Sequence, residues 1–253
     1  MKGSTVFTVM VIGDNPEDLM KNYDINLKVE PYIKYEFDKS EKIKENSISI
    51  LNEIIKNYEA FNINKFQIDF LKERLKEIKN QTTFDYYSEL VNGLKIDSDG
   101  NAWSDKNPNG KWQTYSIGKN FSVPLILKDN TETYQAYNKD VNWKKLHMVD
   151  VELYDLVWDM IHDVKKPSNE QEEKIYNNMK TNMSYFDRFK DKKSYITHCC
   201  SYWNFAILTE EGWKDIDSAK KPNEWVANFF NMFVKQLKPN DKITIYECTK
   251  DKE

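Results

Sequence analysis

Residues suited to metal or acid–base chemistry gather most closely in one segment of the second half of the chain. Asp159, His162 and Asp163 fall on neighbouring turns of a predicted helix. Two carboxylates and an imidazole placed in this way could hold a metal ion for a nucleotide or nucleic-acid hydrolase. The same spacing is also typical of the solvated acidic face of an amphipathic helix. We favour the second interpretation and predict neither a catalytic residue nor a metal ligand here.

A second group combines thiols with an imidazole. His198, Cys199 and Cys200 are consecutive, and Cys248 lies near the end of the chain. Together they would suit zinc, or a thiol nucleophile with the imidazole as its base. We expect the adjacent cysteines on a strand, where their side chains would point to opposite faces, and the sequence has no C-x-x-C spacing. We therefore predict that the thiols act as small buried hydrophobic side chains.

Two turn-like segments match ligand-binding loops only in part. Residues 97–101, Asp-Ser-Asp-Gly-Asn, begin like a calcium loop, but the glycine comes two positions early and Pro108 stands where a bidentate glutamate belongs. Residues 13–17 follow a predicted strand, as a phosphate loop would, yet they contain one glycine and two acids, and carboxylates repel phosphate. Both segments favour structural turns. We predict no cofactor.

Aromatic rings and lysines alternate in a segment that is otherwise rich in turn residues. They are Trp103, Lys111, Trp112, Tyr115 and Lys119. Such rings could stack on a nucleobase while the amines contact phosphates. Core packing explains aromatic residues equally well, but we expect Trp103 and Trp112 in a loop, and loops carry recognition more often than packing. We predict these five residues as a ligand- or partner-binding site.

The composition limits the class of protein. The chain has 253 residues, of which 40% are hydrophobic and 14% aromatic, which is enough for a folded protein with a sizeable core. Its net charge is −4, and Arg74 and Arg188 are its only arginines, which disfavours a general nucleic-acid binder. No apolar run approaches the roughly 18 residues of a membrane span. Three cysteines without framework spacing favour a reducing cytoplasm.

Periodicity and turn signals predict strands at both ends of the chain with helices between them. The first strand covers residues 5–12 and is expected near the centre of a sheet. The remaining predicted elements are a helical hairpin over 40–80 broken at 62–64, a helix capped at Thr82 and running through Leu90, a loop over 92–110, strands within 111–127, a helix over 149–164, a helix from 167, a strand over 201–208, a helix over 222–237 and a strand over 243–248.

The second helix of the predicted hairpin takes its apolar stripe from Phe66, Phe70, Leu71, Leu75 and Ile78. The order of all elements predicts the α+β class. We expect one domain over 1–253 with a helical insertion around 40–90. Its sheet should be mixed or antiparallel and contain the N- and C-terminal strands, with the hairpin and further helices packed around it.

Three separated blocks of the sequence resemble an uncharacterised family of bacteriophage accessory proteins. Residues 7–17 are similar to the family's opening strand, F-T-V-x-V-I-G-D-N-P-E. Residues 97–118 resemble its acidic-glycine loop and the N-P-x-x-K-W-x-x-Y-x-x-G-G-R-W that follows. The third block combines residues 205–208, the Gly212-Trp213 turn, Trp225 and the closing strand. The sequence departs from the family at 118–121, Gly-Lys-Asn-Phe, where the family's arginine and tryptophan are lost.

The resemblance implies a phage-encoded protein that acts in the host cytoplasm against bacterial immunity, as an anti-CRISPR or similar inhibitor. Its partner would be a bacterial defence protein or a nucleotide second messenger, with no role for a membrane. Two alternatives stay open. One is a metal-dependent nucleotide or nucleic-acid hydrolase that uses the Asp159 region. The other is a nucleotide sponge with a pocket around Trp103, Trp112, Tyr115 and Lys119.

Overall fold

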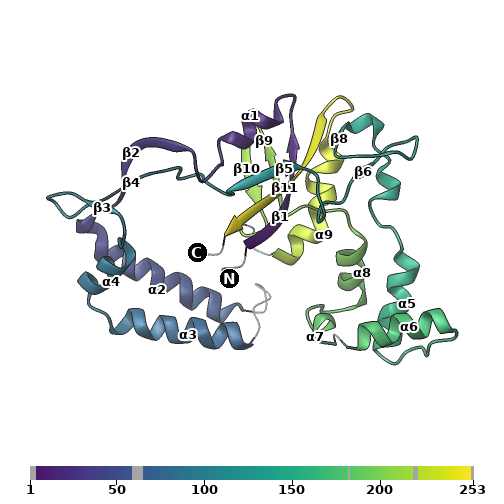
Figure 1. The fold of residues 1–253 in the computed structure, drawn as a ribbon. Coiled ribbons are helices and arrows are strands. Elements are labelled where there is room, and N and C mark those ends of the chain that lie inside the picture. Colours follow the sequence, from purple (N-terminus) through teal and green to yellow (C-terminus); the bar gives the residue numbers. More distant parts are fainter. Residues whose placement is uncertain (1–3, 59–64, 182, 219–221, 252–253) are drawn as a thin grey trace. The chain divides into compact units, whose positions relative to one another are not determined.

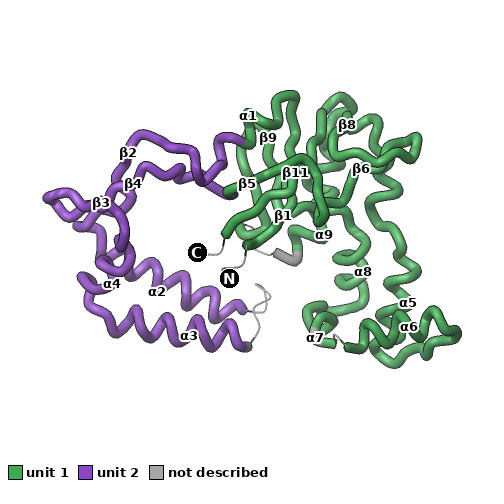
Figure 2. The backbone as a smooth tube through the Cα atoms, in the orientation of Figure 1, with its two compact units in different colours: residues 1–20, 113–253 green, residues 21–112 purple. Residues whose placement is uncertain are grey.

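The computed structural model describes residues 4–58, 65–181, 183–218 and 222–251. Its backbone divides into two compact units (Figure 2). Unit 1 comprises residues 1–20 and 113–253, and unit 2 is the continuous segment 21–112. Unit 2 is therefore an insertion in the sequence of unit 1, and the helical insertion expected around 40–90 falls within it. The expectation of a single domain over 1–253 stays a prediction.

Unit 1 is built on a mixed sheet in which the first and last strands of the chain lie side by side (Figure 1). Its strands are β1 (Ser4–Ile12), β5 (Thr114–Ile117), β6 (Leu125–Ile126), β7 (Glu132–Thr133), β8 (Gln135–Tyr137), β9 (Ala206–Thr209), β10 (Gly212–Asp215) and β11 (Lys242–Asp251). The sheet order is β10-β9-β1-β11-β5, and β8 also pairs with β11, while β6 and β7 form a separate pair. β1 is antiparallel to β11 and parallel to β9. β1 and β9 therefore end at the same edge.

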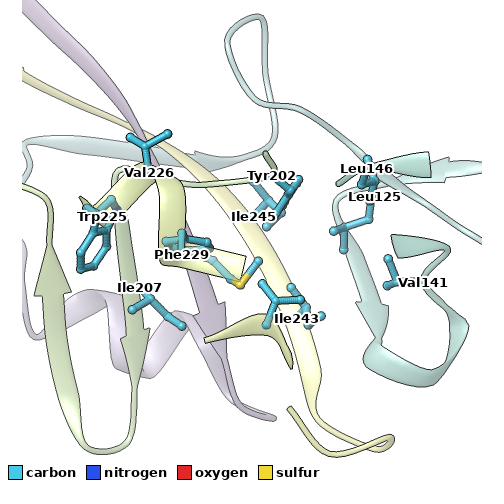
Figure 3. Close-up of a cluster of buried hydrophobic side chains, with 12 residues drawn as sticks. Leu125, Val141, Leu146, Tyr202, Ile207, Trp225, Val226, Phe229, Ile243 and Ile245 are labelled. Atoms are coloured by element: carbon cyan, nitrogen blue, oxygen red, sulfur yellow. The ribbon is translucent and has the colours of Figure 1, made fainter. Parts of the chain in front are cut away.

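The main core of unit 1 lies between this sheet and helix α9 (Pro222–Met232), as Figure 3 shows. Met10 of β1, Ile207 of β9 and the pair Ile243 and Ile245 of β11 meet the buried ring of Phe229. Residues two apart on a strand share a face, so both isoleucines of β11 reach the same core. Each such side chain contributes about 1.5–3 kcal/mol when fully buried. This layer packs β1, β9 and β11 against α9.

Four helices of unit 1 form a second, aromatic core: α5 (Val151–Ile161), α6 (Glu170–Lys180), α7 (Met183–Phe186) and α8 (Lys192–Cys200). The remaining helical segments of unit 1 are α1 (Pro16–Lys21), which ends at the unit boundary, and the short 3-10 turns η2 (Asn138–Asp140), η3 (Trp143–Lys145) and η4 (Val234–Gln236). Val157 and Met160 of α5 are buried with Phe186 of α7 and Tyr195 of α8. Helix α8 begins with a capping box, in which Asp191 and Ser194 bond each other's backbone amides.

Unit 2 combines a helical hairpin with a small sheet. Its elements are β2 (Lys28–Tyr35), η1 (Phe37–Lys39), α2 (Ser40–Lys56), α3 (Lys65–Asn80), α4 (Thr83–Leu90), β3 (Lys95–Ile96) and β4 (Ala102–Lys106). The strands are antiparallel in the order β2-β4-β3. Helix α2 packs on α3 and on α4. The Thr82 side chain accepts a hydrogen bond from the Asp85 amide and so caps α4.

The α+β class is confirmed, with a mixed sheet that contains the N- and C-terminal strands. The central position of β1, the hairpin α2–α3, the cap at Thr82 and the final strand are confirmed as well. Both predicted long helices are shorter than expected: α5 covers Val151–Ile161, and α9 ends at Met232 before the short turn η4. The predicted helix from 167 begins at Glu170, after its cap Asn169. The break expected at 62–64 lies outside the described residues.

Three local predictions are wrong. The segment 92–110 is not all loop, because β3 and β4 lie within it and Trp103 is on β4. Cys199 and Cys200 lie at the end of helix α8 rather than on a strand, because the capping box at Asp191 starts a helix there. The strand expected from 201 begins only at Ala206, since residues 201–205 follow directly on the end of that helix.

Candidate functional site

The five predicted binding residues are divided between the two units. Trp103, Lys111 and Trp112 belong to unit 2, and Tyr115 and Lys119 belong to unit 1. The indole Nε1 of Trp103 donates to the Asp97 carboxylate over 2.8 Å. Trp112 is fully buried, and its ring lies 5.8 Å from that of Tyr23. Within unit 2, therefore, one tryptophan is used to fix a turn and the other is packed. The assignment of a ligand to these five residues stays a prediction.

In unit 1, Tyr115 is half-buried on β5 and contacts an aromatic and acidic group. Its hydroxyl donates to one carboxylate oxygen of Glu17 over 3.1 Å, and the hydroxyl of the buried Tyr246 donates to the other over 2.8 Å. The two tyrosine rings meet edge to face at 5.5 Å. Lys119 is exposed and follows Gly118, which has a positive φ of 51° and where a Cβ would overlap the Tyr134 ring. Glycine is therefore required at the start of this loop.

The calcium-like segment is a closed turn, as expected. The Gly100 amide donates to the Asp97 carbonyl over 3.1 Å, which is the bond of a β-turn. The Asp97 carboxylate accepts from the Trp103 indole and from the amides of Asp99 and Asn101. The hydrogen bond from Trp103, followed by those from Asn101 and Asp99, holds the pKa of Asp97 below its usual value despite some desolvation. Its oxygens are used within the turn.

The Asp159 region is arranged as an ion-pair cluster. Lys192 of α8 lies 2.8 Å from the carboxylate of the buried Asp159 and 2.7 Å from that of Asp155. His162 stacks on Trp158 with ring centroids 3.9 Å apart. Among the residues that the structure describes, no group of three or more His, Cys, Asp and Glu could hold a metal ion. A lysine amine occupies the position near Asp159 that a cation would need.

The thiols of unit 1 are buried at Cys200 and Cys248 and half-buried at Cys199. The Tyr185 hydroxyl lies 3.6 Å from the Cys199 sulfur. Burial raises the pKa of the Cys199 thiol and raises the pKa of Cys200 to about 11. Burial also raises the pKa of Cys248 and lowers the pKa of His198. A thiol is nucleophilic as the thiolate, so these groups are poorly suited to attack a substrate at neutral pH.

A feature that the sequence analysis missed is the outer face of α3, which we define by Phe66, Phe70, Glu73 and Glu77. Phe66 is 83% exposed and Phe70 65% exposed, and both glutamates are exposed too. The spacing of four, three and four residues places all of them on one side of a helix. Asp69 is exposed next to this row. Aromatic rings and carboxylates therefore share one solvent-facing surface.

The opposite side of α3 makes the packing contacts. Ile68 and Ile78 are buried, and Leu71 and Leu75 are half-buried, on the helix that packs against α2. The apolar residues of α3 therefore form two rows rather than one stripe, and the prediction that Phe66 and Phe70 belong to the same stripe as Leu71, Leu75 and Ile78 is wrong. The signal that separates them is Ile68, which continues the row of the other buried residues and lies opposite Phe66.

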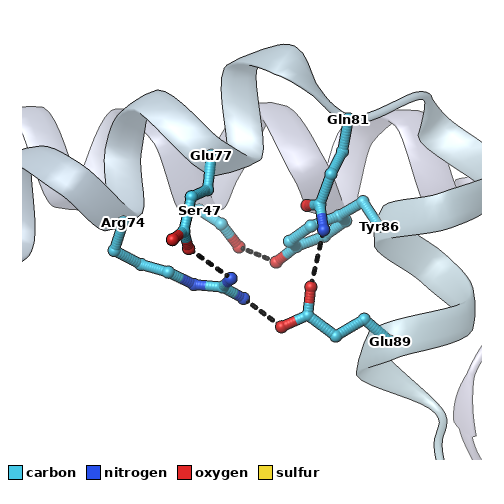
Figure 4. A network of polar contacts seen from close by, with 6 residues as sticks. All are labelled: Ser47, Arg74, Glu77, Gln81, Tyr86 and Glu89. Atoms are coloured by element: carbon cyan, nitrogen blue, oxygen red, sulfur yellow. Dashed lines mark hydrogen bonds and ion pairs between the residues drawn. The ribbon is translucent and has the colours of Figure 1, made fainter.

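Arg74 joins α3 to α4 at the border of the outer face (Figure 4). Its guanidinium donates to Glu77 over 3.2 Å and to Glu89 over 2.5 Å, and Gln81 donates to the second oxygen of Glu89 over 2.7 Å. The hydrogen bonds from Gln81 and Arg74 hold the pKa of the Glu89 carboxyl below its usual value. Glu73 has no hydrogen-bond or ion-pair partner among the described residues. Of the two glutamates of the outer face, Glu77 is thus paired with Arg74, and Glu73 lies unpaired beside the two rings.

Among the described helices, none combines the length and the apolar character that crossing a bilayer requires. Comparisons with protein families, curated proteins and solved structures find no match to this chain.

Proposed function

We propose that this chain is a phage-encoded anti-defence protein that acts without catalysis, by binding a bacterial defence protein in the host cytoplasm. The observation that carries the binding role is the outer face of α3, where two exposed rings lie beside the exposed carboxylates of Asp69 and Glu73. Exposed aromatic patches of this kind mark interaction surfaces. The phage origin and the defence target rest on the sequence resemblance.

The chemistry of the outer face defines the partner surface that fits it. A partner that covers Phe66 and Phe70 gains about 1.5–3 kcal/mol for each ring that becomes fully buried. Asp69 and Glu73 would meet basic groups at the border of that contact, which accelerates association and excludes acidic partners. The complementary surface is therefore an apolar groove with a basic edge.

The test is phage plating on bacteria that carry a panel of single defence systems. Expression of this chain should restore plating on strains that carry the inhibited system. With the double variant Phe66→Ala/Phe70→Ala, phage plating on these strains should be at least tenfold lower than with the unmodified chain at equal protein level. Phe84→Ala is the matched control, since Phe84 is also 65% exposed but has no second exposed ring one helical turn away. A double variant that protects as well as the unmodified chain would overturn the proposal, as would a chain that protects in no strain.

The two alternative functions have less support in the geometry. A hydrolase would need a cation at Asp159, where Lys192 already lies. A sponge built around Trp103 and Trp112 would need accessible rings, and Trp112 is fully buried. Consumption of a nucleotide with added Mg²⁺, abolished by a chelator, would replace the binding proposal by the hydrolase.

A further inference from the structure

A cavity of about 570 Å³ opens in unit 1 at the edge of the sheet where β1 and β9 end. The two strands are parallel, with Val9 opposite Ala206 and Val11 opposite Leu208, so the segments that follow them emerge together. Ligands of α/β proteins commonly bind beyond the carboxyl ends of adjacent parallel strands. The volume lies in the range of small-molecule sites, about 300–1,000 Å³.

Five apolar side chains line one part of the cavity, which we call its floor. Ile12 and Ile207 come from the sheet, and Met232, Phe233 and Leu237 come from the end of α9 and from η4. Met232 is 45% exposed, which leaves apolar surface open to a ligand. A flat apolar group would cover this floor and remove it from water.

The rim carries charges of both signs. Asp14 follows β1 and Glu210 follows β9, whereas Lys238 precedes β11 and Lys242 is its first residue. Within the described part of the chain, no hydrogen bond or ion pair engages these four side-chain charges. Asp241 also lines the cavity between these two lysines, and its carboxylate accepts a hydrogen bond from the Lys238 amide over 2.7 Å. Glu211 and Lys214, by contrast, lie 3.8 Å apart and partly neutralise each other.

This arrangement restricts the ligand. A purely anionic ligand would be repelled by Asp14 and Glu210, and a purely cationic one by the lysines. A ligand that fits has a flat ring for the floor, hydroxyl or amine donors for the carboxylates and an anionic group for the amines. We propose that this cavity binds a nucleoside phosphate. The base covers the apolar floor, the ribose hydroxyls donate to Asp14 and Glu210, and the phosphate contacts Lys238 and Lys242.

This inference is separate from the proposed role of the outer face of α3, because it involves only unit 1 and needs no partner protein. Titration calorimetry with the full chain tests it, using adenosine 5′-monophosphate, adenosine, inorganic phosphate and tryptophan as probes. We expect the monophosphate to bind at least tenfold more tightly than adenosine or phosphate alone. Tryptophan tests whether the floor simply takes any flat ring with two charges. Equal or tighter binding of phosphate or tryptophan would overturn the proposal, as would no binding of the monophosphate at millimolar concentration.

Two variants locate the site. Lys238→Ala should lower the affinity for the monophosphate at least fivefold. Lys235→Ala changes a lysine of η4 outside the cavity lining and should leave that affinity unchanged. Asp14→Asn should reduce the preference for the monophosphate over its 2′,3′-dideoxy analogue, because the ribose hydroxyls lose their carboxylate acceptor. Both sites are exposed, so unchanged melting temperatures of the free variants would show that the fold is intact. Binding that is the same in Lys238→Ala and Lys235→Ala would place the ligand elsewhere and overturn the proposal.

Discussion

The helices α5–α8 of unit 1 and the hairpin α2–α3 of unit 2 are both rich in aromatic and charged residues, but they arrange them in opposite ways. In α5–α8 the rings of Phe186 and Tyr195 are inside, and Lys192 forms ion pairs with two carboxylates at the border. In the hairpin, aliphatic side chains of α3 face inward while Phe66 and Phe70 face solvent. The first region uses its aromatic residues for stability. The second leaves them available to a partner.

This difference shows that a high aromatic content does not by itself identify a binding surface. What distinguishes the two regions is whether a ring lies in the row that packs against a neighbouring element. A ring in the packed row should matter for folding, and a ring outside it should matter only for binding. Substitutions in the two regions test this distinction directly.

The largest expected effect is that of Phe186→Ala in α7. Phe186 is 3% exposed and lies 5.2 Å from the Tyr195 ring, so truncation should leave a cavity and cost about 3–5 kcal/mol of unfolding free energy. Chemical denaturation measures this loss, and hydrogen exchange should show reduced protection in α5 and α8. Phe186→Leu keeps part of the side-chain volume and should therefore lose less unfolding free energy than Phe186→Ala. A loss below about 1 kcal/mol for the alanine variant would mean that this cluster is not closely packed.

Lys192→Met should have the next largest effect. The variant removes the amine that lies between Asp155 and Asp159 and leaves the buried Asp159 without its closest cation, at a cost of about 1–3 kcal/mol. Lys174→Met is the matched control, because Lys174 pairs with Glu170 on an open helix surface, where such pairs contribute at most about 1 kcal/mol. Equal losses in the two variants, measured by denaturation, would argue against a structural role for the Asp159 cluster.

Glu89→Gln should have a smaller effect that depends on pH. The folded pKa of Glu89 is below its usual value of 4.5, so its stabilising contribution is complete above that pH and is lost as pH falls through the lower folded value. The difference in unfolding free energy between the unmodified chain and Glu89→Gln should therefore shrink as pH falls below about 4.5. Denaturation at several pH values measures it. Glu73→Gln, without a described partner, is the control, and a difference that does not change with pH would contradict the expectation for Glu89.

The smallest expected effect on stability is that of Phe70→Ala. Its ring is 65% exposed, and substitutions at exposed sites usually change stability by about 0.5 kcal/mol or less. Thermal and chemical denaturation should barely distinguish the variant from the unmodified chain. A loss comparable to that of Phe186→Ala would show that Phe70 packs within the protein, and the contrast between the two regions would disappear.

Regular periodicity explains which elements could be predicted from the sequence. The run of β-branched and apolar residues that stops at the turn beginning with Gly13 predicts β1, and the long Lys-Glu-Ile-Leu runs predict α2 and α3. Helix α8 was missed because its sequence, KKSYITHCC, contains several residues of low helix propensity. Its N-cap residue Asp191 is a readable signal of a helix start. Strand β4 was missed because its five residues lie between two turn-rich segments.

The candidate site was harder to predict than the fold. Phe66 and Phe70 stand four residues apart and match helical spacing as well as any buried pair does. Only the position of Ile68, which is buried, separates the packed row from the exposed one. The cavity beyond β1 and β9 depends on the parallel pairing of strands almost 200 residues apart, which no local pattern reveals.

The insertion of unit 2 between Met20 and Gln113 also has a consequence for synthesis on the ribosome. Unit 2 is closed at its base by a bridge between Asp24 and Trp112 and by a hydrogen bond from the Lys111 amide to the Tyr23 carbonyl, all within one contiguous stretch. β1 is translated before its two partner strands. β9 is translated only from residue 206 onward and β11 only from residue 242 onward. β1 must therefore stay unpaired while nearly the whole chain is translated, and its apolar residues 9–11 are the ones most in need of protection by chaperones during that interval.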